Sequence, residues 1–308
     1  MELVRGLTNL AAKYRGAVVT IGAFDGLHLG HLALLARVRA QAAQLARPAM
    51  MITFEPLPRE FLSPDDPPAR LTDLRERWRL LQHAGLSALC VLRFDEQLRS
   101  LSGEQFIELL AHDVAASAVI VGHDFRFGRG GATSASALEV AGRSHGFAVE
   151  IVGPVLASET RVSSSEIRAA LDRGDFRAAA SLLGRPYSMR GRVVAGERLG
   201  QKLGYPTANL RMHRLRSPLG GIFAVRVHVD RGTDSLPGVA SLGTRPTVGG
   251  GEPLLEVHIF DFTDDLYGRE LEVVFVAKLR AEEHFSSLEA LVAQMHQDAA
   301  DARAILAA

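Results

Sequence analysis

The chain has 308 residues, of which 47% are hydrophobic and 23% charged, a composition typical of an ordinary globular protein and unlike that of a disordered chain. The 35 basic residues balance the 35 acidic ones, so no bulk charge favours nucleic acid or a membrane surface as partner. One cysteine excludes an internal disulfide, and neither a signal-peptide core nor a membrane-spanning run is present. We therefore expect a cytoplasmic protein of two domains, monomeric or weakly homo-oligomeric.

The first half of the chain alternates short apolar runs with longer helical stretches. We expect strands at residues 18–21, 50–54, 88–94, 118–121 and 147–152. Helices are expected at 32–45, 74–83, 103–114 and 136–145, with two more at 164–171 and 176–183 that close this half. This alternation predicts a doubly wound, Rossmann-like parallel sheet, in which ligands bind beyond the carboxyl ends of the strands.

A pair of histidines follows the first of these strands. The strand stops at Gly22, and the pattern His28-x-Gly30-His31 lies where the next helix begins. The free N–H groups of a helix N-terminus favour phosphate, and Gly30 allows the backbone to approach it closely. Two imidazoles there can donate hydrogen bonds to a polyphosphate in its transition state. The alternative is two ordinary histidines near a turn, but the whole strand-turn-helix pattern favours a phosphate site.

A second segment with phosphate-binding chemistry runs from Arg161 to Arg168. It opens a helix with three hydroxyls, at 163–165, between two arginines. Helix capping by the serines and Glu166 explains part of this pattern. It does not explain the flanking guanidinium groups, which together with hydroxyls and free N–H groups favour a polyphosphate clamp.

A third segment, residues 121–128, follows the strand expected at 118–121. Asp124 can bind a ribose or a base, and Phe125 and Phe127 can pack on a flat ring. Aromatic side chains that merely anchor the loop in the core are an equally good interpretation of either phenylalanine alone.

The pattern changes after Gly184-Arg185-Pro186. Glycine and proline interrupt strand-like runs at 189–195, 222–229, 238–242, 254–260 and 271–279. Several of these runs alternate apolar and polar residues, which predicts an antiparallel sheet closed as a small barrel. An amphipathic helix with apolar residues from Leu288 to Ala302 ends the chain, and we expect it to pack on the barrel.

Two features of this half carry possible chemistry. Thr207 and Asn209 are two positions apart in an extended stretch, so their oxygens can face the same way and suit Mg²⁺. Glu256 is a carboxylate in a mostly apolar strand and can take a proton from a substrate hydroxyl. Taken alone, Glu256 fits a solvent-facing strand residue better, but the glycine turns and the Pro206-Thr207-Ala208-Asn209 motif in the same half of the chain favour a catalytic role.

Together these segments strongly resemble the bacterial bifunctional riboflavin kinase/FAD synthetase family. The resemblance covers essentially the whole chain, at residues 21–31, 121–128, 162–168, 204–209, 238–247 and 255–260. The His28-x-Gly30-His31 pattern alone indicates only a nucleotidylyltransferase, whereas Pro206-Thr207-Ala208-Asn209 in a separate half is much more specific. The family implies an FMN adenylyltransferase domain at 1–184 and a riboflavin kinase domain at 185–308.

The resemblance also implies roles for residues of the first half. FMN would attack the α-phosphorus of ATP and release pyrophosphate, while His28 and His31 act as the catalytic residues. The implied ATP and phosphate contacts are Gly22, Phe24, Asp25, Gly30, Asp124, Arg161, Ser164, Ser165 and Arg168. The implied flavin contacts are Phe54, Pro56, Pro58 and Phe125.

In the second half, the family implies that Thr207 and Asn209 hold Mg²⁺ with ATP and that Glu256 activates riboflavin. Riboflavin, FMN and ATP are then substrates, and FAD is the product. The alternatives are a single-activity nucleotidylyltransferase with an inert barrel and a barrel that senses flavin without phosphorylating it. The chain departs from the family pattern at Ala23, Gln201 and Ser241, departures that concern affinity more than activity.

Overall fold

The computed structural model describes residues 1–196, 200, 203–230, 232–244 and 253–307. The chain divides into two compact units. The first consists of Met1–Pro68 and Leu74–Ser163, and the second of Ala69–Asp73 and Ser164–Ala308. Among the described residues, no helix is both long and apolar enough to cross a membrane.

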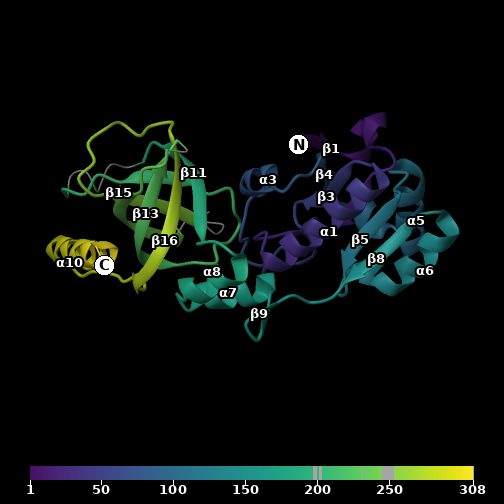
Figure 1. Cartoon of the computed structure of the whole chain (residues 1–308). Helices are drawn as coiled ribbons and strands as arrows, with labels where there is room; N and C mark the ends of the chain where they lie inside the picture. The colour runs from purple at the N-terminus through teal and green to yellow at the C-terminus, as the bar shows by residue number, and fades with distance from the viewer. Residues whose placement is uncertain (197–199, 201–202, 231, 245–252, 308) are drawn as a thin grey trace. The chain divides into compact units, whose positions relative to one another are not determined.

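The first unit is built on a parallel sheet with the strand order β1-β4-β3-β2-β5-β8 (Figure 1). Its strands are β1 (Glu2–Arg5), β2 (Val18–Ile21), β3 (Ala49–Glu55), β4 (Ala88–Arg93), β5 (Ala118–Gly122) and β8 (Ala148–Val152). All five neighbouring pairs are parallel. The order reverses direction at β2, so the carboxyl end of this central strand is where a doubly wound sheet binds ligands.

Helices cover both faces of this sheet, because alternate residues of each strand face opposite sides. On one face, Val18 and Met51 pack with α1 (Leu29–Leu45) and α3 (Leu74–Gln82). On the other, Val19 and Met50 pack with α5 (Gly103–Glu108), a π-helical turn at Leu109–Asp113, and α6 (Ala135–His145). The smaller elements are α2 (Pro58–Leu62), α4 (Glu96–Ser100), β6 (Arg126–Phe127), β7 (Thr133–Ser134), β9 (Leu156–Ala157) and β10 (Thr160–Arg161).

The second unit contains a closed antiparallel barrel with the strand order β11-β12-β15-β14-β13-β16 (Figure 1). Its strands are β11 (Ser188–Val194), β12 (Ala208–Arg211), β13 (Gly221–Val229), β14 (Leu236–Thr244), β15 (Pro253–Ile259) and β16 (Glu270–Arg280). Its helices are α7 (Ser164–Asp172), α8 (Phe176–Leu183) and α10 (Leu288–Ala307). Burial alternates along β15: Leu255 and Val257 are buried, whereas Glu256 and His258 are half-buried. The α/β sheet and the barrel with a terminal helix are both confirmed.

The boundary between the two units does not fall at a single position in the sequence. The sequence pattern groups α7 and α8 with the first half, but α8 packs on the barrel, where Phe176 stacks on Phe275 with ring centroids 6.0 Å apart. Segment Ala69–Asp73 also belongs to the second unit, because the Arg214 guanidinium donates to the Arg70 and Leu71 carbonyl oxygens at 3.1 Å. These are tertiary contacts that the composition break near Gly184 does not reveal.

Candidate active sites

The two histidines lie together at the start of α1. His28 is the N-cap residue, and its Nδ1 accepts a hydrogen bond from the His31 backbone N–H at 3.3 Å. The neutral His28 ring therefore carries its proton on Nε2. The two rings stack, with centroids 3.5 Å apart and planes 14° apart. Both imidazoles thus lie at a helix N-terminus that favours anions.

The turn before α1 is tightly shaped around these rings. Phe24 is buried with a positive φ of 50°, and its ring centroid lies 4.9 Å from that of His31. Such a conformation is costly for a residue other than glycine, and it recurs at functional sites. A Cβ on Gly30 would lie 3.2 Å from the His28 ring and 3.7 Å from the Val162 carbonyl oxygen. The chain around Val162 therefore passes directly beside the two histidines.

The segment next to Val162 brings two other expected site residues together. The Arg161 Nη2 donates to Asp124 Oδ2 at 2.7 Å, and both side chains are exposed. Phe125, next to Asp124, is half-buried and stacks on the buried Phe127, with centroids 5.5 Å apart. Phe127 thus anchors the loop in the core, while Phe125 keeps an accessible edge.

The remaining expected residues of this half lie on separate elements. Phe54, the last residue but one of β3, is buried with its ring perpendicular to that of Phe94, and Pro56 and Pro58 after it are half-buried. Ser164, Ser165 and Arg168 lie on α7, which belongs to the second unit. There the Arg168 Nε donates to the Ala69 carbonyl oxygen at 2.6 Å, which ties α7 to Ala69–Asp73.

In the barrel, strand register places three polar residues in one row. Asn209 of β12 is opposite Glu256 of β15, which is opposite Ser241 of β14. Directly opposite residues share a face of the sheet and lie within contact distance. Two residues that the sequence analysis proposed separately, Asn209 and Glu256, are therefore neighbours.

Asn209 is buried, and its Oδ1 has no hydrogen-bond partner within the described part of the chain. A buried oxygen of this kind is rare and calls for an explanation. A Cβ on Gly196 would lie only 2.3 Å from Asn209 Nδ2, so glycine is required there for the side chain to fit. Over the described residues no cluster of three His, Cys, Asp or Glu side chains forms a metal site. The Asn209 amide oxygen fits Mg²⁺ as a ligand, because Mg²⁺ binds few protein groups and fills the rest of its coordination shell with waters and phosphate oxygens.

Thr207 lies just before β12, and the two residues that precede it are held by hydrogen bonds. The His258 Nδ1 donates to the Pro206 carbonyl oxygen at 2.9 Å. The Tyr205 hydroxyl is hydrogen-bonded to Nδ1 of His296 on α10 at 2.6 Å. These bonds fix the segment that carries Thr207 and Asn209 to both β15 and α10.

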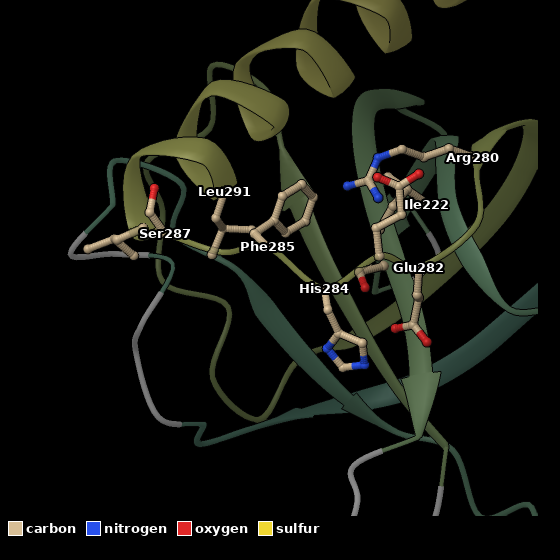
Figure 2. A pocket seen from close by; sticks show the side chains of 10 residues that line it. Ile222, Arg280, Glu282, His284, Phe285, Ser287 and Leu291 are labelled. Carbon is tan, nitrogen blue, oxygen red and sulfur yellow. The ribbon is translucent and has the colours of Figure 1, made fainter.

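A cavity of about 520 Å³ continues the row of polar residues (Figure 2). Ser241 lines it together with Ile222 and Arg280, which are its successive neighbours across β13 and β16. Arg280 is held in place by two-pronged hydrogen bonds to Asp298 of α10, which raise the pKa of its guanidinium. Figure 2 shows Arg280 and Glu282 on one side of the cavity and the apolar Phe285 and Leu291 on the other. The cavity thus combines apolar surface with a few charged groups, as small-molecule sites do.

Comparisons with known proteins identify the family of each half of the chain. A family model for FAD synthetase matches residues 10–166, and one for riboflavin kinase matches residues 183–306. The chain is 46% identical to the bifunctional riboflavin kinase/FMN adenylyltransferase of Pseudomonas fluorescens, over 100% of this chain and 98% of that protein. The chain belongs to the bifunctional riboflavin kinase/FMN adenylyltransferase family. It carries both enzymatic domains and is a transferase of flavin biosynthesis.

Other members of the family and a solved structure extend the likeness. The bifunctional riboflavin kinase/FMN adenylyltransferase of Escherichia coli strain K12 is 42% identical, over 98% of this chain and 97% of that protein. A crystal structure named as a macrolide-efflux protein from Streptococcus pneumoniae has a TM-score of 0.79 and 31% identity, with 97% of each chain covered. That name belongs to the other protein; the likeness to this chain is one of fold.

Several residues that line the cavity were not predicted from the sequence. Ser241 was identified only as a departure from the family pattern, and Arg280 and Glu282 were given no role, although all three line the cavity. No local signal marks Arg280 and Glu282, because one ends a strand and the other follows it as ordinary charged residues. Gln201, the other departure in this half, lies outside the described residues.

Proposed function

We propose that the two activities run at two separate sites, with FMN adenylylation in residues 1–184 and riboflavin phosphorylation in residues 185–308. The observation that carries the kinase assignment is the neighbouring pair of Asn209 and Glu256, in which the Asn209 oxygen has no hydrogen-bond partner among the residues that the structure describes. A protein that only binds flavin has no need of a cation ligand next to a base.

In the proposed kinase step, the cavity beside Ser241 takes the flavin. Its volume lies within the range of about 300–1,000 Å³ for small-molecule sites. Glu256 accepts the proton of the ribityl hydroxyl, whose oxygen then attacks the γ-phosphorus of ATP and displaces ADP. Thr207 and Asn209 would hold Mg²⁺, which supplies positive charge against the phosphates. The His258 contact to Pro206 keeps these ligands in place.

In the proposed adenylylation step, a phosphate oxygen of FMN attacks the α-phosphorus of ATP, and pyrophosphate leaves. The stacked His28 and His31 donate hydrogen bonds to the phosphates as charge develops on them. The helix N-terminus adds its partial positive charge. The proposed nucleotide contacts are Gly22, Phe24, Asp25, Gly30, Asp124, Arg161, Ser164, Ser165 and Arg168, and the proposed flavin contacts are Phe54, Pro56, Pro58 and Phe125.

The alternatives are a single-activity nucleotidylyltransferase with an inert barrel and a barrel that senses flavin. One experiment separates them: incubation of the whole chain with riboflavin and Mg–ATP, followed by chromatography of the flavins. The proposal expects FMN and then FAD. Riboflavin returned unchanged, while added FMN still becomes FAD, would establish an inert or sensing barrel. We further propose a cytoplasmic location, a monomer or weak homo-oligomer, and no nucleic-acid partner.

A further inference from the structure

The first unit contains a buried arginine close to its proposed substrate segments. Arg77 lies on α3, and its side chain is 0% exposed. Arginine is almost never fully buried unless its charge is paired. Its position is also unusual in sequence, because it lies on the same helical face as the buried Leu81 and the half-buried Leu74.

The Arg77 guanidinium joins two neighbouring segments of the chain. Its Nη1 donates to the Ala23 carbonyl oxygen at 2.7 Å and to Thr53 Oγ1 at 3.0 Å. Its Nη2 donates to Glu55 Oε2 at 2.9 Å. Thr53 reinforces the link, because its own hydroxyl donates to the Ala23 carbonyl oxygen at 3.3 Å.

The residues that Arg77 binds are interleaved with the proposed substrate contacts. Ala23 lies between Gly22 and Phe24, at the carboxyl end of β2, where ATP is proposed to bind. Glu55 lies between Phe54 and Pro56, at the end of the adjacent strand β3, where the flavin is proposed to bind. The Arg77 guanidinium thus links the segment proposed to bind ATP, at Ala23, to the segment proposed to bind the flavin, at Glu55.

We propose that Arg77 is a positioning residue for FAD formation, which fixes the distance between the ATP segment at Ala23 and the flavin segment at Glu55. This inference rests on the proposed substrate contacts of those segments. Arg77 touches neither substrate. Its planar fork of donors reaches several acceptors at fixed angles, which the single ammonium group of lysine cannot do. Adenylylation needs the FMN oxygen aligned with the α-phosphorus of ATP. If the link through Arg77 is weakened, we therefore expect a large fall in the rate of FAD formation and only a small change in the affinity for ATP alone or FMN alone.

The test compares Arg77→Lys with Arg75→Lys, a matched exposed position on the same helix. A misplacement of reacting groups by about 1 Å costs about 100-fold, so we expect Arg77→Lys to lower kcat for FAD formation by roughly 10- to 100-fold per folded molecule. Calorimetric affinities for ATP alone and FMN alone should change little. Riboflavin phosphorylation, and all rates of Arg75→Lys, should stay normal.

Thr53→Val is a second variant that keeps the size of the buried side chain and removes one acceptor of Arg77. It should lower kcat in the same direction by a smaller factor. The proposal is overturned if kcat per folded molecule, with the folded fraction measured by circular dichroism, is unchanged in Arg77→Lys. Equal loss in Arg75→Lys overturns it as well. The variant His28→Ala tests the proposed adenylylation site separately from the role of Arg77. If His28→Ala forms FAD at the normal rate, the proposed site itself is wrong. If His28→Ala loses FAD formation while Arg77→Lys keeps it, only the role of Arg77 is rejected.

Discussion

The substitution Glu256→Gln tests the chemistry proposed for the barrel. Glu256 lies between Asn209 and Ser241 in the strand register, half-buried on β15. Glutamine keeps the length, shape and hydrogen-bonding ability of the side chain, but its amide cannot accept the hydroxyl proton of riboflavin. The barrel packing around Leu255 and Val257 faces the other way and is left unchanged.

The expected loss follows from the role of a general base. Such a group contributes about 10² to 10⁴ in rate, which corresponds to roughly 2.7 to 5.4 kcal/mol in the activation free energy. Because the substitution removes proton acceptance and keeps the size of the side chain, the loss should fall on kcat for FMN formation. The KM for riboflavin should stay close to normal, since the cavity lined by Ser241 and Arg280 is intact.

The assay follows FMN formation from riboflavin and Mg–ATP by chromatography, with the conversion of added FMN to FAD as an internal measure of folding. Asp301→Asn, an exposed carboxylate-to-amide change on α10, is the matched control and should keep both rates. If Glu256→Gln phosphorylates riboflavin as fast as the unmodified chain, Glu256 is a structural strand residue and the proposed mechanism fails.

Three further outcomes are expected. Asn209→Ala removes the side-chain oxygen proposed to bind the metal, so riboflavin phosphorylation should require higher Mg²⁺, and an unchanged Mg²⁺ titration would contradict the metal assignment. Burial raises the pKa of the Cys90 thiol to about 12, so the native chain should resist thiol reagents at pH 8. Because the unfolded thiol ionises near ~8.5, the free energy of unfolding should fall as pH rises from about 9 towards 12. A fragment of residues 1–184 should convert FMN to FAD and leave riboflavin unchanged. It should unfold at a lower denaturant concentration than the whole chain, because it lacks Tyr187 and Arg214, which donate hydrogen bonds to the Leu71 carbonyl oxygen.

Local patterns predicted most of the fold. The β-branched run at Val18–Ile21 is β2 residue for residue, and the helix expected at 176–183 is α8. By contrast, β1 was missed because only Val4 of its residues is buried, which leaves no periodic signal. Strand β12 was foreseen only as an extended stretch, since a run of four residues carries little pattern of its own.

The grouping of candidate residues was predictable where one segment carries them, as with His28 and His31 at the start of α1. The pairing of Asn209 with Glu256 depends on the register of β12 and β15, which lie far apart in the sequence. The bond between Arg161 and Asp124 and the buried links of Arg77 are also tertiary. For Arg77, however, a charged residue on the apolar face of a predicted helix was a usable signal.

The most direct test of the whole account is the product distribution of His28→Ala incubated with riboflavin and Mg–ATP. Losing one transition-state donor costs about 10²- to 10³-fold, so FMN should accumulate at the normal rate while FAD formation falls by at least about 100-fold. This result requires two separate sites on one chain. Normal formation of FAD would contradict the role of the histidines, and equal loss of FMN and FAD would contradict the separation of the sites.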